Sequence, residues 1–112
     1  MKSRVIVTRF APKGLVLNLF GFYLTRDDSW VDARIINHER IHDAQQRELL
    51  YIPFYLLYLL EYLVRLIQFR NHDKAYRNIS FEREAYANDK DFNYLVRRRL
   101  FSFRRYLNKK DD

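Results

Sequence analysis

Residues 49–69, LLYIPFYLLYLLEYLVRLIQF, form the most apolar segment of the chain and restrict the folds that it can adopt. The segment is close in length to a helix that spans a bilayer. Glu61 and Arg65 stand four residues apart within it and can pair on one helix face. Two charges near its middle argue against a simple lipid-exposed span. The segment therefore predicts a hydrophobic helix at 53–69, buried in the domain or partly lodged in a membrane surface.

The composition of this 112-residue chain fits a single domain, 1–112, with one core, because nearly half of its residues are apolar. Two glycines and two prolines leave little material for tight turns, which favours helices over a many-stranded sheet. The absence of cysteine excludes disulfides. Any metal site must therefore use histidine, aspartate or glutamate.

The N-terminal segment 4–26 is expected to be extended. It begins with a β-branched run, contains a turn signal at Pro12-Lys13-Gly14, and continues into residues 15–24, which are rich in Val, Leu, Phe and Tyr. Two or three short antiparallel strands are predicted here. The early apolar run is broken by Arg9 and is too short for the core of a signal peptide.

Helices are expected in the remainder of the chain. The residues Asp27-Asp28-Ser29 offer N-cap candidates for a first helix. Residues 70–79 are polar and are interpreted as a loop. The fold class predicted is α+β, with the strands followed by three to four helices. Their predicted ranges are 30–50, 53–69, 80–89 and 91–108.

The segment His38-Glu39-Arg40-Ile41-His42 carries the clearest chemical signal. Residues four apart on a helix differ by about 40° in direction, so both imidazoles can reach one zinc ion at about 2 Å. Glu39 lies about 100° round the helix from His38 and can accept the proton of a zinc-bound water, whose pKa the metal lowers. This division of labour is the mechanism behind the HExxH signature.

A zinc site of this type needs a third protein ligand, and the candidates are His72, Glu82 and Glu84. His72 lies in the polar loop without matching periodicity, and Glu84 falls on a different helix face from Glu82. A di-iron site built on Glu39 and His42 would need a second Glu-x-x-His pair, which the chain does not contain.

The pairing of HERIH with the later segment FEREAYA resembles the gluzincin group of metallopeptidases. It is most similar to the pattern of integral-membrane prenyl-protein and heat-shock proteases and of minimal single-domain gluzincins. The segment 36–89, about half the chain, also resembles small uncharacterised bacterial proteins that carry an HExxH helix, a very hydrophobic helix and a FEREAYA helix. This resemblance implies a zincin-like minimal domain.

The resemblance also implies site residues. Glu82 takes the place of the third ligand, which opens a Glu-x-x-Ala-Asp-like motif in those families. Tyr86 stands where the aspartate is usual, so the residue that orients a ligand must be Asp43, Tyr86 or Asp89. One strand, from residues 15–24, would lie along the cleft and pair with an extended peptide or protein substrate.

A tyrosine or histidine should stabilise the oxyanion in such a reaction. Three candidates, which the sequence does not rank, are Tyr76, Tyr86 and His72.

The C-terminal stretch 92–110 holds five arginines and two lysines with no acid, while the rest of the chain balances 14 basic against 14 acidic residues. The net charge of +7 is therefore a feature of one segment. It predicts a basic amphipathic helix, either solvated or in contact with an anionic membrane surface. Lipid is favoured over nucleic acid because aromatic residues alternate with its arginines: Arg97, Arg98, Arg99, Arg104 and Arg105.

The sequence thus predicts a zinc-dependent hydrolase, a metallopeptidase with zinc on His38, His42 and Glu82 and with Glu39 as general base. The alternative is a non-catalytic protein with a vestigial metal site that binds a membrane surface through its basic helix. The predicted location is the cytoplasm, with peripheral contact at the inner membrane surface.

Overall fold

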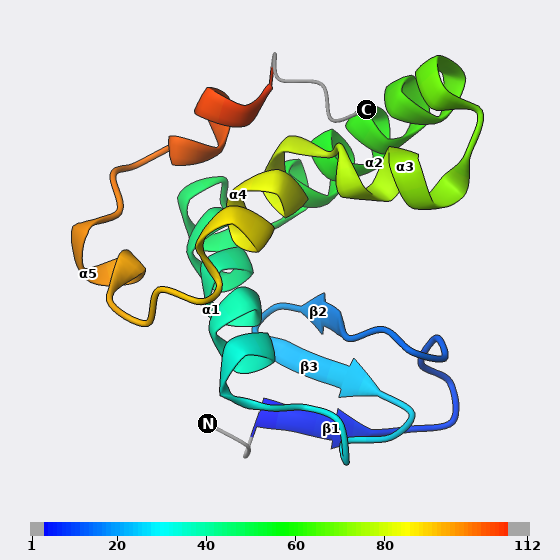
Figure 1. Cartoon of the computed structure of the whole chain (residues 1–112), viewed down its shortest axis with the longest axis vertical. Helices are drawn as coiled ribbons and strands as arrows, with labels where there is room; N and C mark the ends of the chain where they lie inside the picture. The colour runs from blue at the N-terminus through cyan, green and yellow to red at the C-terminus, as the bar shows by residue number, and fades with distance from the viewer. Residues whose placement is uncertain (1–3, 108–112) are drawn as a thin grey trace.

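A three-stranded mixed sheet forms the N-terminal layer of the computed structural model, which describes residues 4–107. The strands β1 (Val5–Val7), β2 (Leu17–Leu19) and β3 (Phe22–Thr25) lie in the order β1-β3-β2. β2 and β3 form an antiparallel hairpin, whereas β1 runs parallel to β3. The expectation of purely antiparallel strands is therefore wrong, because β3 inserts between β1 and β2 (Figure 1).

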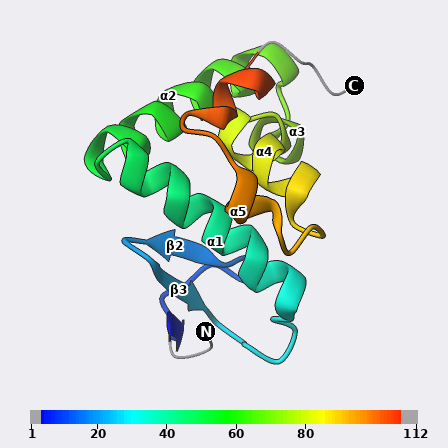
Figure 2. The same ribbon diagram turned by 90° about the vertical axis from the view of Figure 1, so that its left-hand side faces the viewer.

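The helices that follow the sheet complete an α+β fold, which confirms the predicted class. Figures 1 and 2 show α1 running between the sheet on one side and the remaining helices on the other. In chain order, the helical elements are α1 (Ala33–Glu48), α2 (Ile52–Phe69), α3 (His72–Arg77), α4 (Ser80–Asn88), α5 (Tyr94–Arg97) and the 3-10 helix η2 (Ser102–Tyr106).

The helix α1 begins later than the sequence predicts. The Asp27 carboxylate accepts a hydrogen bond from the Ser29 backbone in a turn, and Val31 is buried against the sheet. Asp32 is the N-cap, since its carboxylate accepts from the Ile35 backbone N–H at 2.9 Å. The helix then runs between two hydrophobic clusters, one facing the sheet and one formed with α2, α4 and η2.

The segment 70–79, expected as a loop, contains the short helix α3. Asn71 caps it by accepting from the Lys74 backbone N–H at 3.0 Å. The next helix, α4, is capped from a distance: the Glu61 carboxylate on α2 accepts from both the backbone N–H and the hydroxyl of Ser80, each at 2.6 Å. Glu61 also pairs with Arg65 at 3.6 Å, and together these contacts fix α4 against α2.

The basic helix expected at 91–108 is not continuous. α5 ends at Arg97, Arg98 is extended, Phe101 has a positive φ of 58°, and η2 follows. The break occurs because the Arg98 side chain turns inward to two buried carboxylates instead of facing solvent. Position 108, with the basic residues Lys109 and Lys110, lies outside the described part of the chain.

Candidate metal centre

The helix α1 is buried on almost every side, and its central residues are polar. His38 and His42 lie one turn apart on the face that meets α4, and Glu82 comes from the first turn of α4. All three side chains are less than a tenth exposed. Because Glu61 caps α4 at Ser80, two residues before Glu82, the apolar helix α2 helps to set the position of the Glu82 carboxylate.

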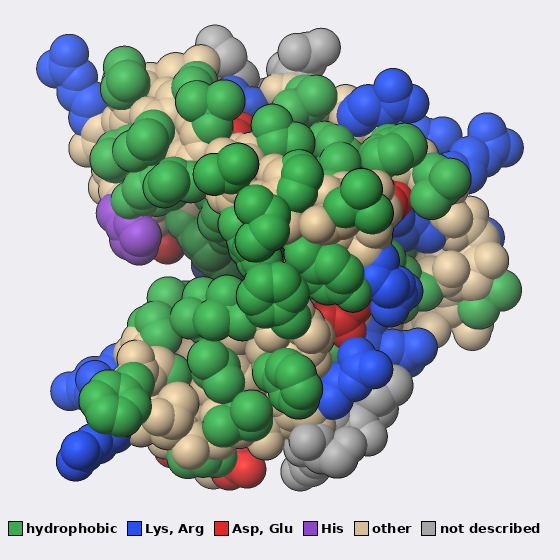
Figure 3. All heavy atoms as spheres, turned by 180° about the vertical axis from the view of Figure 1, so that it is seen from behind, with side chains coloured by type: hydrophobic (Ala, Val, Ile, Leu, Met, Phe, Trp, Pro, Cys, Tyr) green, Lys and Arg blue, Asp and Glu red, His purple; other side chains and the backbone are tan. Residues whose placement is uncertain are grey.

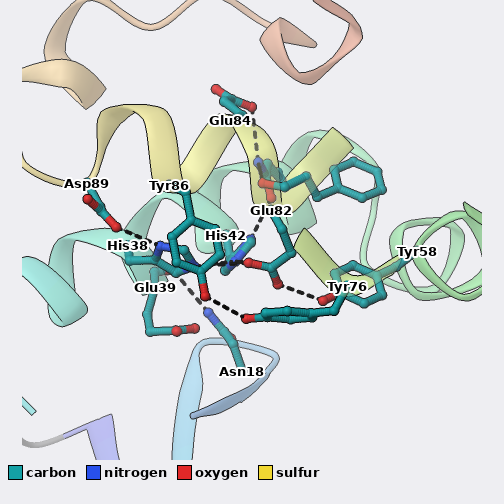
Figure 4. A network of polar contacts seen from close by, with 12 residues as sticks. Asn18, His38, Glu39, His42, Tyr58, Tyr76, Glu82, Glu84, Tyr86 and Asp89 are labelled. Atoms are coloured by element: carbon teal, nitrogen blue, oxygen red, sulfur yellow. Dashed lines mark hydrogen bonds and ion pairs between the residues drawn. The ribbon is translucent and has the colours of Figure 1, made fainter. Parts of the chain in front are cut away.

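The three predicted ligands converge on one point (Figure 4). The Nε2 atoms of His38 and His42 are 3.1 Å apart, and each lies 3.1 Å from Oε1 of Glu82. Zinc–ligand bonds of about 2.0–2.1 Å give a tetrahedral site whose ligand atoms are separated by roughly 3.4 Å. The observed triangle matches one face of such a tetrahedron to within a few tenths of an ångström.

The outer nitrogens of both imidazoles donate to acceptors. Nδ1 of His38 contacts Oδ2 of Asp89 at 3.1 Å, and a carboxylate only accepts. Nδ1 of His42 contacts Oε1 of Gln45 at 2.7 Å. The orientation of the Gln45 amide is fixed because its Nε2 donates to the Phe81 carbonyl and the Glu84 carboxylate. Each neutral imidazole therefore carries its proton on Nδ1 and presents an Nε2 lone pair to Glu82.

The convergence of these three electron-rich atoms indicates a binding site for a cation. Two imidazole lone pairs and a carboxylate oxygen at mutual distances of 3.1 Å repel one another unless positive charge lies between them. One proton can bridge only one pair of these atoms, whereas a divalent metal contacts all three. Nitrogen and oxygen donors of this kind suit zinc.

Glu39 follows His38 on α1 but points into a neighbouring pocket of about 250 Å³. The pocket is bounded by residues 15–19, which include β2, and by residues of α1 and α2, and it reaches His42 and Glu82. Within residues 4–107, no side chain or backbone N–H donates to the Glu39 carboxylate. The carboxylate is thus available to a molecule in the pocket, on the side where the two ligands are also accessible.

Burial and the charges within the cluster raise the pKa of some of its groups and lower the pKa of others. Burial raises the pKa of Glu39 to about 7, while the two histidines act in the opposite sense. Burial lowers the pKa of His42, but the charge of Glu82 outweighs it and raises that pKa to about 10. Burial acts to raise the pKa of Glu82, and the adjacent histidines hold it well below its usual range. The metal-free cluster therefore binds a proton tightly.

The structure distinguishes among the residues considered for orienting a ligand. Asp89 accepts a hydrogen bond from His38 and also forms an ion pair with Arg34 at 3.2 Å. Asp43 instead holds the sheet to α1 through the Tyr23 hydroxyl at 2.5 Å. Tyr86 packs edge-on against the His38 ring, with centroids 4.5 Å apart. Of these three candidates, Asp89 is therefore the one that accepts a hydrogen bond from an imidazole of the cluster.

The structure also distinguishes among the remaining candidates for the oxyanion donor and for the third ligand. Tyr76 lines the pocket beside Glu39, and its hydroxyl lies 3.2 Å from that of Tyr86. His72 is exposed and contacts Tyr62 instead of the metal cluster. Glu84 is buried in a separate ion pair and is not one of the converging ligands.

Two contacts to His42 and Glu82 were not predicted from the sequence. The Tyr58 hydroxyl donates to Oε2 of Glu82 at 2.6 Å, and Gln45 accepts from His42. The sequence contained a signal for Gln45, since a glutamine on the buried stripe of a helix requires polar partners. Tyr58 offered no such signal, because it is one of several tyrosines along α2.

The five arginines proposed for a membrane surface have different environments. Arg98 is 4% exposed and forms ion pairs with Glu48 and Glu84 at 2.8 and 2.5 Å. Arg97 pairs with Asp91. Arg99, Arg104 and Arg105 are exposed to solvent. Arg98 is therefore a structural residue.

No protein-family model, curated protein or solved structure matches this chain.

Proposed function

We propose that the chain is a zinc-dependent hydrolase, most simply a metallopeptidase, with zinc bound by His38, His42 and Glu82. The observation that carries the proposal is the orientation of the two imidazoles. Asp89 and Gln45 accept hydrogen bonds from the Nδ1 atoms, so that both Nε2 atoms face Glu82 beside an open pocket. Ligand sets of two histidines and one glutamate are typical of catalytic zinc, which keeps a fourth position for water or substrate.

When bound, the metal would supply Lewis acidity, lowering the pKa of a water and polarising a carbonyl. Glu39 would accept a proton from the water as its oxygen adds to the carbonyl carbon. The same carboxyl would return that proton to the leaving nitrogen as the carbon–nitrogen bond breaks. A pKa near 7 suits both transfers at neutral pH. The products are a carboxylic acid and an amine, and the net reaction consumes one water.

The pocket is consistent with an extended, apolar substrate. Its walls include Leu15, Leu17 and Leu19 from the β2 region and Phe54 from α2. β2 is an edge strand of the sheet and borders the pocket, as the resemblance to peptidases implies for a strand that pairs with substrate. The Tyr76 hydroxyl is a donor in the same pocket. Burial and the charge of Glu82 raise its pKa, so it stays protonated at neutral pH.

Two measurements test the proposal. Elemental analysis of the purified protein should find about one zinc per chain, and Glu82→Gln should lose it. Glu39→Gln should retain zinc, since Glu39 is not one of the converging ligands, but should abolish cleavage of fluorescence-quenched peptides that the wild type hydrolyses.

The outcomes separate metal binding from catalysis. Failure of the zinc-supplemented wild type to bind zinc at neutral pH would remove the metal centre and the hydrolase together. Zinc binding with peptide cleavage that is identical in wild type and Glu39→Gln would leave a metal site without the proposed chemistry.

A further inference from the structure

The long helix α2 carries its polar residues on the side that faces the protein. Tyr58 donates to Glu82, Tyr62 contacts His72, and Tyr55 donates to Gln46 at 3.0 Å. The ion pair of Glu61 and Arg65 lies on the same side, where both side chains are at most 14% exposed. The inward face of this helix therefore holds its polar groups together with the core residue Phe54, whereas an ordinary surface helix turns its polar groups to solvent.

The outward face of α2 is an uninterrupted apolar stripe. Its members share one side of the helix, most of them three or four residues from the next, and their exposed fractions lie between 46% and 76%. Their helical positions extend over about 22 Å along the axis. We name this set the α2 stripe, and it consists of Ile52, Leu56, Leu59, Leu60, Leu63 and Ile67.

An apolar surface of this extent is uncommon on a monomer and marks a contact with a partner or a membrane. Figure 3, which shows the molecule from the α2 side, has hydrophobic side chains across much of this face, with Lys and Arg towards its margins. By length and composition alone, α2 also suffices to cross a bilayer, and only 11% of it is buried.

The charges near the stripe favour an anionic partner. The segment 47–70 contains two acids, Glu48 and Glu61, and both are buried in ion pairs. Its two exposed charges are Arg47 and Arg70, which flank α2 at its two ends. No exposed acid in this segment therefore opposes a negative surface.

The short helix η2 joins positive charge to the apolar face. Phe103 and Leu107 line a groove together with Leu57 and Val64 of α2. The adjoining residues of the same C-terminal segment line a basic hollow that holds Arg99, Arg104 and Arg105. Apolar surface and solvent-exposed guanidinium groups thus occur side by side, as an anionic lipid headgroup and its acyl chain require.

The orientation of α2 follows from its inner face. The tyrosines and the Glu61–Arg65 pair bind the rest of the protein along most of the helix, so α2 cannot span a bilayer without breaking these bonds. A helix with one apolar face and one face held by protein can instead lie in the plane of the interface.

We propose that the α2 stripe and the arginines of the basic hollow form a docking surface for an anionic lipid bilayer, with α2 lying in the membrane plane. This surface does not depend on zinc binding. The proposed membrane contact lies mainly on α2, whereas the sequence predicted it on a continuous basic helix. It also brings α2, which positions Glu82 through Glu61 and Tyr58, into direct contact with the lipid.

Vesicle sedimentation tests the proposal. The wild type should sediment with vesicles of phosphatidylcholine and phosphatidylglycerol and bind at least tenfold less to phosphatidylcholine alone. The triple variant Leu59→Gln, Leu63→Gln, Ile67→Gln should lose this binding. A control triple variant of exposed apolar residues outside both the α2 stripe and the basic hollow should retain it: Phe10→Gln, Phe92→Gln, Val96→Gln.

A second measurement does not depend on how the triple variants fold. The chain has no cysteine, so a single Leu63→Cys can be labelled with an environment-sensitive fluorophore. Its emission should shift to the blue when anionic vesicles are added, and a label at Val96→Cys should not respond. No shift at position 63, equal sedimentation of both triple variants, or a lipid-free dimer that the stripe substitutions dissociate would each overturn the proposal.

Discussion

Arg98 and Glu84 form a buried ion pair, with Nε of the guanidinium 2.5 Å from Oε2 of the carboxylate. Arg98 also reaches Glu48 on α1 with both terminal nitrogens, at 3.0 and 2.8 Å. Glu84 in turn accepts from Gln45, which contacts the proposed ligand His42. A residue from the C-terminal segment therefore joins α1 to α4 directly behind the candidate metal centre.

Replacement of Arg98 by alanine should strongly destabilise the fold. The change leaves Glu48 and Glu84 with 4% and 0% exposed side chains and no compensating cation, a situation that costs about 3–5 kcal/mol. Arg99→Ala, one residue on and exposed, is the control and should change little. Urea unfolding of both variants measures the difference. Equal midpoints would show that the buried pair contributes nothing.

Gln45→Ala should weaken zinc binding without removing a ligand. Loss of the acceptor for Nδ1 frees the His42 ring to turn and to change tautomer, and such losses typically cost 10–100-fold in metal affinity. Gln46→Ala is a matched control, because Gln46 is equally buried on α1 but contacts Asn18 and Tyr55 instead of a ligand. Competition against a chelator gives both affinities. A comparable loss in the two variants would assign the effect to general destabilisation.

The sequence predicted the convergence of His38, His42 and Glu82 more completely than the surroundings of these residues. Helical periodicity alone places His38 and His42 on one face, so HERIH is sufficient for that pair. Glu82 required the resemblance of FEREAYA, because no local rule connects two helices 40 residues apart. The partner of His42 depends on where α4 places Glu84, which only tertiary packing decides.

Local periodicity also failed in the C-terminal segment. Residues 92–107 repeat apolar positions at three and four, which predicts one helix. The helix is interrupted at Arg98, because its guanidinium forms ion pairs with two buried acids. The backbone at Arg98 is extended as a result. The burial of the Glu61–Arg65 pair on the inward face of α2 was equally unpredictable, because the sequence does not reveal which face a helix presents to the core.

The stabilisation by zinc should grow as the pH rises. In the metal-free protein the pKa of His42 is about 10, against about 6.5 in an unfolded chain. The protonated imidazole therefore contributes its full stability below about pH 6.5 and loses it as the pH passes through about 10. Zinc must displace this proton, so its apparent affinity increases over the same interval.

Thermal unfolding with and without zinc checks this pH dependence. The difference in Tm between the zinc-loaded and metal-free protein should widen steadily from about pH 6 to about pH 9. Glu82→Gln should show neither the zinc effect nor the pH-dependent loss, because the charge that raises the pKa of His42 is gone. A constant difference in Tm across this range would show that no proton is exchanged for the metal.

Tyr76→Phe should lower kcat while leaving zinc in place. The Tyr76 hydroxyl lines the pocket with Glu39 and Glu82 but is not a ligand, and its raised pKa keeps it a hydrogen-bond donor. Removing a donor that stabilises an oxyanion costs about 10²–10³ in kcat with little change in KM. Tyr62→Phe is the matched control on α2, because it loses only a contact with exposed His72. If kcat falls equally in both variants, or if Tyr76→Phe raises KM alone, Tyr76 binds substrate or packs in the wall and does not act on the oxyanion.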